Sequence, residues 1–349
     1  MDQQYTLRLE TIEKELKRWL PDNPDQTWAA RVFGSSVNPQ LLRALTAPCG
    51  DLLSRGGKRW RPLLMTLVCE ALGGGGAAIP LAPLVEFCHN ASLIHDDIED
   101  NSDERRGRPA VHILHGVDMA INSGSFLYFL PLACIDHWAI ESAAGIAPKA
   151  ESHKARVYAL WGNYMRKLHL GQAMDIHWHR NIDTIPPIEE YHVMCALKTG
   201  CLARFAAELG STVAETVTAD GFDAQAARRL CEAAEQLGVG FQILDDVKNL
   251  TTGLPGKKRG DNIVEGKKSL PLLLFLHSQP EKIEVVRRCF TRAGSGGVSV
   301  PEVEELIQLF LSAGAIAEAE EQGKALIAEA RSTLAGAGNL LAGFADLIS

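Results

Sequence analysis

Apolar residues recur every three or four positions along most of the chain, which is the spacing of one face of an α-helix. Helices are therefore predicted at 7–19, 41–53, 63–72, 80–100, 119–140, 152–180, 187–200, 222–250, 303–311 and 315–334. No segment alternates apolar and polar residues over the length of a strand. The pattern predicts an all-α fold: one large helical bundle over 1–349, with outer helices in 1–45 and C-terminal helices in 300–349.

The longest uncharged run, 119–135, is shorter than the roughly 20 apolar residues that a membrane-spanning helix needs. It also contains Asn122 and Pro131, which suit a core helix better than a lipid-facing one. Residues 1–5 lack the basic and then apolar pattern of a secretory signal. We expect no membrane span and a cytoplasmic protein.

Composition narrows the function further. The 35 Lys and Arg residues against 43 Asp and Glu residues give a net charge of −8, which argues against a nucleic-acid partner. A polyanionic substrate would have to be attracted by local cations or by a metal. The 8 cysteines form no C-x-x-C pair, and we interpret them as reduced core residues.

The first candidate site is the acidic end of the helix predicted at 80–100. Asp96 and Asp100 lie one helical turn apart, with Asp97 beside them. Like charges at this spacing repel by about 0.2–0.5 kcal/mol per pair, and they oppose the helix dipole. Because a divalent cation would reverse both effects, the cluster indicates a Mg²⁺ site that leaves coordination positions for substrate phosphates.

A second cluster repeats this design. Asp245 and Asp246 end another apolar helical run, and Asn249 offers an oxygen one turn later. Either cluster alone could be a solvated acidic helix end. Their matching apolar surroundings favour one central cavity that both clusters approach.

Several cations accompany these carboxylates. Lys58 and Arg61 lie at the start of a predicted helix, where exposed N–H groups attract phosphate, although a basic surface loop has the same composition. Arg105 and Arg106 follow the first cluster as either ion-pair partners or bidentate diphosphate ligands.

Three further features are less specific on their own. Lys198 interrupts an apolar face, as either a snorkelling side chain or an inward phosphate ligand. His89 lies two turns before Asp96 on the same side of its helix. The glycine-rich basic loop 253–266 has the composition of a lid that orders on ligand binding.

Taken together, these motifs resemble the trans-isoprenyl diphosphate synthases of the polyprenyl synthetase family. The resemblance runs from about 56 to 274, and 90–129 is most similar to geranylgeranyl diphosphate synthases. The matching motifs, in chain order, are Gly-Gly-Lys-x-x-Arg-Pro at 56–62, the acidic motif at 96–100, Arg-Arg-Gly at 105–107, Gly171-Gln172, Lys198-Thr199, Phe-Gln-x-x-Asp-Asp at 241–246, and Glu-Gly-Lys at 265–267.

The resemblance implies an isoprenoid synthase fold, a homodimer and Mg²⁺-dependent chemistry with three ions, Mn²⁺ being a second candidate. It implies head-to-tail condensation of isopentenyl diphosphate with dimethylallyl, geranyl or farnesyl diphosphate. The products would be diphosphate and a longer all-trans prenyl diphosphate of C20 or more.

The resemblance also assigns roles to residues. The implied metal ligands are Asp96, Asp97, Asp100, Asp245, Asp246 and Asn249. The implied contacts to the allylic diphosphate are Arg105, Lys198 and Lys267, and those to isopentenyl diphosphate are Lys58, Arg61, His89 and Arg106. The other implied substrate contacts are Thr199, Lys258 and Gln242, the last near the reacting centre.

Two positions depart from the family pattern. Asn249 and Asn262 replace aspartates, which puts the coordination of the third metal in question. The basic partner in this loop is either Lys257 or Lys258.

The length of the product should depend on the helix that precedes Asp96. Ala91 and Ser92 lie about one turn earlier and are small, so we expect the growing chain to pass them and exceed C15.

Three other functions fit parts of this pattern. His95-Asp96 is also the central pair of His-Asp metal phosphohydrolases, which need no second acidic cluster. A class I terpene cyclase would not need the second diphosphate site. A noncatalytic regulatory partner of a prenyl synthase would not need two clusters of repelling carboxylates.

Overall fold

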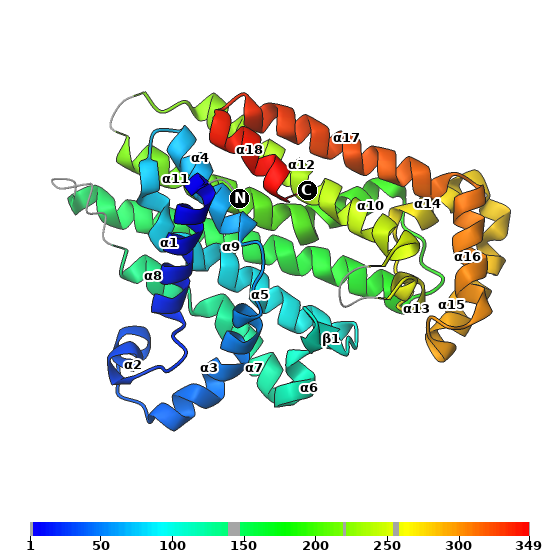
Figure 1. The fold of residues 1–349 in the computed structure, drawn as a ribbon, viewed down its shortest axis with the longest axis horizontal. Helices are drawn as coiled ribbons and strands as arrows, with labels where there is room; N and C mark the ends of the chain where they lie inside the picture. Colours follow the sequence, from blue (N-terminus) through cyan, green and yellow to red (C-terminus); the bar gives the residue numbers. More distant parts are fainter. Residues whose placement is uncertain (1–2, 139–146, 219–220, 254–257, 349) are drawn as a thin grey trace. The chain divides into compact units, whose positions relative to one another are not determined.

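The computed structural model describes residues 3–138, 147–218, 221–253 and 258–348, and it is helical almost throughout (Figure 1). The prediction of an all-α fold is confirmed. The described chain forms two compact units: 1–164, 202–231 and 333–349 make up the first, and 165–201 with 232–332 make up the second. The expectation of a single domain stays a prediction.

The first unit contains the N-terminal helices and the first acidic cluster. Its elements are α1 Gln3–Trp19, α2 Gln26–Phe33, α3 Pro39–Ser54, α4 Trp60–Ala71, the 3₁₀ helix η1 Gly75–Leu81, α5 Ala82–Glu99, β1 Glu104–Arg105, β2 Arg108–Pro109, α6 Val111–His115, α7 Val117–Phe129, α8 Leu132–Asp136 and α18 Asn339–Ile348.

The second unit contains the other acidic cluster. Its elements are α10 Ile188–Cys195, the π-helical turn η3 Ala196–Gly200, α13 Asp261–Val264, α14 Leu270–Ser278, the 3₁₀ helix η4 Pro280–Lys282, α15 Ile283–Gly296 and α16 Pro301–Ser312. Four helices have residues in both units: α9 Ala147–Arg180, α11 Cys201–Val217, α12 Ala224–Thr251 and α17 Ala315–Ala335.

One helix prediction and the prediction that the chain has no strand were wrong in detail. The predicted helix 119–140 is split into α7 and α8 at Leu130 and Pro131, because proline has no N–H to continue the helical ladder; residues 139 and 140 lie outside the described chain. The predicted absence of strands misses the two-residue pair β1 and β2, which forms the hairpin that carries Arg105.

The helix α5 is the buried centre of the first unit. Most of its side chains are inaccessible, including Leu84, Phe87 and Ile94. The helix α7 packs closely on it at Gly124, where a Cβ atom would lie 2.7 Å from Cε1 of His95. A side chain at position 124 would therefore push α7 away from the helix that carries the first acidic cluster.

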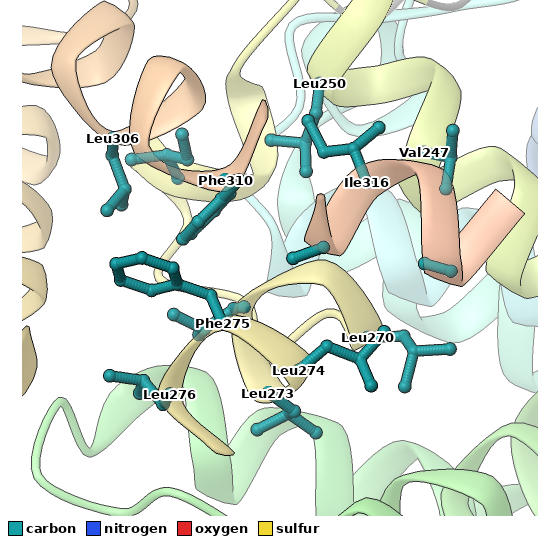
Figure 2. Packing of buried hydrophobic residues seen from close by; sticks show 14 of the residues in the cluster. Val247, Leu250, Leu270, Leu273, Leu274, Phe275, Leu276, Leu306, Phe310 and Ile316 are labelled. Atoms are coloured by element: carbon teal, nitrogen blue, oxygen red, sulfur yellow. The ribbon is translucent and has the colours of Figure 1, made fainter. Parts of the chain in front are cut away.

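The core of the second unit is built around α14. Figure 2 shows Phe275 of α14 facing Phe310 of α16. Their ring centroids are 5.2 Å apart. Val247 and Leu250 near the end of α12 belong to the same buried cluster. Burying such aliphatic side chains contributes about 1.5–3 kcal/mol each, so the helix end next to Asp245 and Asp246 is firmly anchored.

Two stretches, Gly75–Glu99 and Val117–Asp136, are long and apolar enough to cross a membrane by length and composition alone. In the most apolar 18-residue window of each stretch, 67% of the first and 50% of the second is buried inside the structure, and core helices share this property. The expectation of no membrane span stays a prediction.

Candidate active site

In the first unit, the three carboxylates at the end of α5 differ in how far they are buried. Asp97 is completely buried, whereas the Asp96 side chain keeps 18% of its surface exposed. Asp100 caps the helix by donating its N–H to the Asp96 carbonyl at 2.8 Å. Among these predicted metal ligands, Asp96 and Asp100 are therefore accessible to solvent, whereas Asp97 is not.

Arg105 is the internal counter-cation of this cluster. Its Nε donates to Oδ1 of Asp97 at 2.8 Å, and its Nη2 lies 3.5 Å from Oδ2 of Asp96. Burial alone would lower the pKa of Arg105, but the neighbouring carboxylates outweigh it and leave that pKa raised. Arg55 fixes the hairpin by donating to the carbonyls of Arg105 and Arg108, at 2.9 and 3.3 Å.

His89 lies in a strongly positive environment. Burial lowers its pKa well below the ordinary value, and the charges of Arg61, Arg106, Arg105 and Arg59 lower it further. A neutral imidazole among guanidinium groups can donate a hydrogen bond without adding charge repulsion. The structure thus places the charges of Arg61, Arg105 and Arg106 close to His89, and the binding of a diphosphate by these side chains stays a prediction.

The loop that carries Lys58 is tied to the rest of this unit. Arg59 has the left-handed backbone angle φ 47° and pairs with Glu86 at 2.9 Å and with Glu13 at 2.6 Å. Arg106 donates to the carbonyl of Leu52 at 3.3 Å and to that of Gly56. The Lys58 side chain is exposed beside these anchors.

In the second unit, the two aspartates of α12 also differ. Asp245 is exposed, whereas Asp246 is buried and accepts hydrogen bonds from three side chains. The donors are Tyr191 at 2.8 Å, Gln242 at 3.2 Å and Asn262 at 3.2 Å. Burial raises the pKa of Asp246 to about 6, against the opposing effects of the Tyr191 hydroxyl and Lys267.

The predicted helix 187–200 ends in the π-helical turn Ala196–Gly200, which presents Lys198 and Thr199. Nζ of Lys198 lies 2.6 Å from Oδ2 of Asp175. The close approach of α9 to this turn depends on Gly171, where a Cβ atom would lie 2.4 Å from the Lys198 backbone nitrogen. Thr199 donates to Oε1 of Gln242 at 2.8 Å, which connects this turn to the acidic helix.

The remaining predicted contacts lie in the loop that follows α12. Lys267 pairs with Glu265 at 2.9 Å. The Lys258 side chain is exposed, whereas Lys257 lies outside the described residues. Closure of a lid at 253–266 stays a prediction.

Among the described residues, no three His, Cys, Asp or Glu side chains lie close enough to hold a metal ion by themselves. Mg²⁺ does not require such a cage, because it commonly uses one or two carboxylates with waters and substrate phosphates. The pairs Asp96 with Asp100 and Asp245 with Asp246 fit that donor set. A cavity that both clusters approach stays a prediction.

Two positioning residues were not predicted from the sequence. Tyr191 is 55 positions from Asp246, and Asp175 is 23 positions from Lys198, so no local spacing links either pair. Asp175 belongs to the segment that begins at Gly171-Gln172, and this motif was the only sequence signal for its role.

The two residues predicted to affect product length both lie on α5. Ala91 is buried, and the Ser92 hydroxyl donates to the His89 carbonyl at 2.8 Å.

Comparison with known proteins identifies the family. The polyprenyl synthetase profile matches residues 42–309. A short chain isoprenyl diphosphate synthase of Methanocaldococcus jannaschii is 34% identical over 262 residues, which cover 74% of this chain and 73% of that protein.

Solved structures agree. The geranylgeranyl pyrophosphate synthetase of Pyrococcus horikoshii has a TM-score of 0.79 and 27% identity, covering 99% of this chain and 95% of that one. A geranylgeranyl pyrophosphate synthase from Corynebacterium glutamicum, complexed with isoprenyl diphosphate and magnesium, has the same fold at a TM-score of 0.74 and 23% identity, covering 96% of each chain. The chain therefore belongs to the polyprenyl synthetase family and is a prenyltransferase that condenses isopentenyl diphosphate with an allylic diphosphate.

Proposed function

We propose that this prenyltransferase makes an all-trans prenyl diphosphate of C20 or longer with the help of three Mg²⁺ ions, for which Mn²⁺ can substitute. The main support is that each unit places an acidic helix end against cations suited to a diphosphate. When bound, the metal ions supply positive charge to the departing diphosphate. A resident metal fits here because the carboxylates of Asp96 and Asp245 reach solvent beside buried, hydrogen-bonded neighbours.

The side chains have separate tasks in this proposal. Arg105, Lys198 and Lys267 hold the allylic diphosphate and stabilise its charge as the C–O bond breaks. Lys58, Arg61, His89 and Arg106 hold isopentenyl diphosphate, whose double bond then attacks the allylic cation. Gln242 lies near that cation, Thr199 contacts the substrate beside it, and the released diphosphate accepts the proton. No nucleophilic side chain takes part.

An assay with Mg²⁺, labelled isopentenyl diphosphate and allylic primers of three lengths tests this function. We expect chain elongation to depend on both substrates and to stop when EDTA removes the metal. Release of phosphate without isopentenyl diphosphate would indicate a hydrolase, and a cyclic hydrocarbon would indicate a terpene cyclase. The absence of turnover would favour a regulatory partner.

We expect Ala91→Phe and Ser92→Phe to shorten the product, because a phenyl ring one turn before Asp96 should close the path of the growing chain. Ala91 is buried, so overpacking there costs about 1–3 kcal/mol, whereas Ser92 is half-buried and can accept the larger side chain more easily. Chromatographic sizing of the prenyl chains measures the effect. An unchanged product distribution in a folded Ser92→Phe protein would contradict this placement of the channel.

We propose a homodimer that works in the cytoplasm. All 8 cysteines are buried, and none of them forms a disulfide, which suits a reducing compartment. The surface of the first unit exposes a group of apolar side chains on α6 and α7: Ile113 at 54%, Leu114 at 46%, Val117 at 49% and Ile121 at 45%.

Charges on this apolar surface should separate the dimer. Val117 and Ile121 lie one turn apart on α7, so Val117→Glu with Ile121→Glu would place two carboxylates in the interface. We expect light scattering to give the mass of one chain for this variant and of two chains for the wild type. A wild-type monomer, or a variant that remains dimeric, would rule out this interface.

A further inference from the structure

Two buried asparagines meet where the end of α12 contacts the loop 258–262, whose last two residues also begin α13. Asn249 is fully buried, and both polar atoms of its amide are used. Its Oδ1 accepts the N–H of Asn262 at 3.0 Å, and its Nδ2 donates to the carbonyl of Lys258 at 3.3 Å. The Asn249 side chain thus binds the loop backbone, and its oxygen is already occupied in this structure.

Asn262 makes three connections from one residue. Besides its N–H bond to Asn249, its Nδ2 donates to Oδ1 of Asp246 at 3.2 Å. Its carbonyl accepts the N–H of Lys267 at 2.8 Å. With only 6% of its surface exposed, Asn262 connects an acidic side chain of α12 to the backbone of a cationic residue.

These bonds require amides. A carboxylate at 262 would face the carboxylate of Asp246 with no proton to donate. A carboxylate at 249 could still accept from Asn262, but it would turn an anion toward the Lys258 carbonyl. Because both polar atoms of the Asn249 amide and Nδ2 of Asn262 already have partners, the arrangement needs no cation to satisfy them.

The backbone reinforces this geometry. The N–H of Gly260 donates to the Asn249 carbonyl at 2.8 Å, and Nε of Arg259 donates to the Leu250 carbonyl at 3.1 Å. Gly260 has φ 91°, and a Cβ atom there would lie 2.5 Å from Cγ1 of Val303. The loop is therefore held on α12 by side chains and backbone together.

We propose that Asn249 and Asn262 form a metal-independent latch, which holds the loop 258–262 on α12 and positions Asp246 and Lys267 before any cation or diphosphate binds. The roles of Asp246 and Lys267 rest on the proposed function. The latch itself is a property of the substrate-free protein and is tested without turnover, so its failure is distinguishable from a failure of that function.

Hydrogen exchange of the full-length protein in EDTA tests the latch. We expect the amides of Gly260, Asn262 and Lys267 to be protected in the wild type. In Asn262→Asp they should exchange about ten-fold faster, as expected from the loss of a buried hydrogen bond. The matched control is Asn181→Asp, which adds the same charge at an exposed position of the same unit. Amides of α14 serve as the reference for global stability.

Manganese gives a second and independent readout. Asn262→Asp creates a site of opposed carboxylates, so adding Mn²⁺ should restore its protection and increase the number of bound ions counted by electron paramagnetic resonance. Asn249→Leu removes both amide bonds without adding a ligand, so its faster exchange should persist with Mn²⁺. The proposal is overturned if the wild-type amides become protected only after Mn²⁺ is added, or if Asn262→Asp behaves like Asn181→Asp.

Discussion

Replacing Lys198 by glutamine should lower kcat by about 10²–10³-fold, the usual cost of removing one preorganised charge that stabilises a transition state. Lys198 is held in place by Asp175 at 2.6 Å and by the π-helical turn that carries it. Because the leaving diphosphate gains charge during the reaction, kcat and kcat/KM should fall together. Steady-state kinetics with saturating primer measure both.

The control for this experiment is Lys324→Gln. Lys324 is exposed on α17 and pairs with Glu320 one turn away, so its replacement removes the same charge from an exposed surface position. Equal activity of Lys198→Gln and Lys324→Gln would show that Lys198 does not contact the reacting diphosphate. A change in KM alone would assign Lys198 to ground-state binding.

Asp97→Asn should destabilise the protein by about 3 kcal/mol, because it leaves the largely buried charge of Arg105 without its closest anion. The Asp97 side chain has no exposed surface and that of Arg105 keeps 20%, so water compensates only partly. Urea unfolding followed by circular dichroism measures the change. The catalytic rate should fall as well, because Asp97 orients the Arg105 guanidinium beside Asp96.

A double variant separates stability from catalysis. Asp97→Asn with Arg105→Gln removes both buried charges, so it should recover much of the lost stability while remaining inactive. Asp103→Asn is the matched control, since Asp103 is exposed a few residues later. If the double variant is no more stable than Asp97→Asn, the ion pair does not account for the stability of this helix end.

The pattern of apolar residues predicted the long helices of the fold. The apolar pattern located the bounds of α5 and α12 within about two residues, because that pattern depends only on residues a few positions apart. The same pattern extended α7 through Pro131, because hydrophobicity takes no account of a missing N–H.

The candidate site was predictable as a set of residue types and not as a geometry. Spacing along one helix groups Asp96, Asp97 and Asp100, but it does not show that Asp97 is buried against Arg105. The same limit applies to Asn249, for which the sequence predicts a role as a metal ligand. In the structure its side-chain amide hydrogen-bonds to the backbone of Asn262 and Lys258. Contacts between distant segments depend on tertiary packing, which no local period encodes.

The pairing of Arg105 with Asp97 gives the acidic end of α5 one internal counter-charge. Because a single guanidinium faces the carboxylates of Asp96, Asp97 and Asp100, the helix end keeps a net negative charge that still favours a divalent cation. A bound diphosphate would compete with Asp97 for the guanidinium of Arg105, and a divalent cation held by Asp96 and Asp100 would supply the positive charge that Asp97 then lacks.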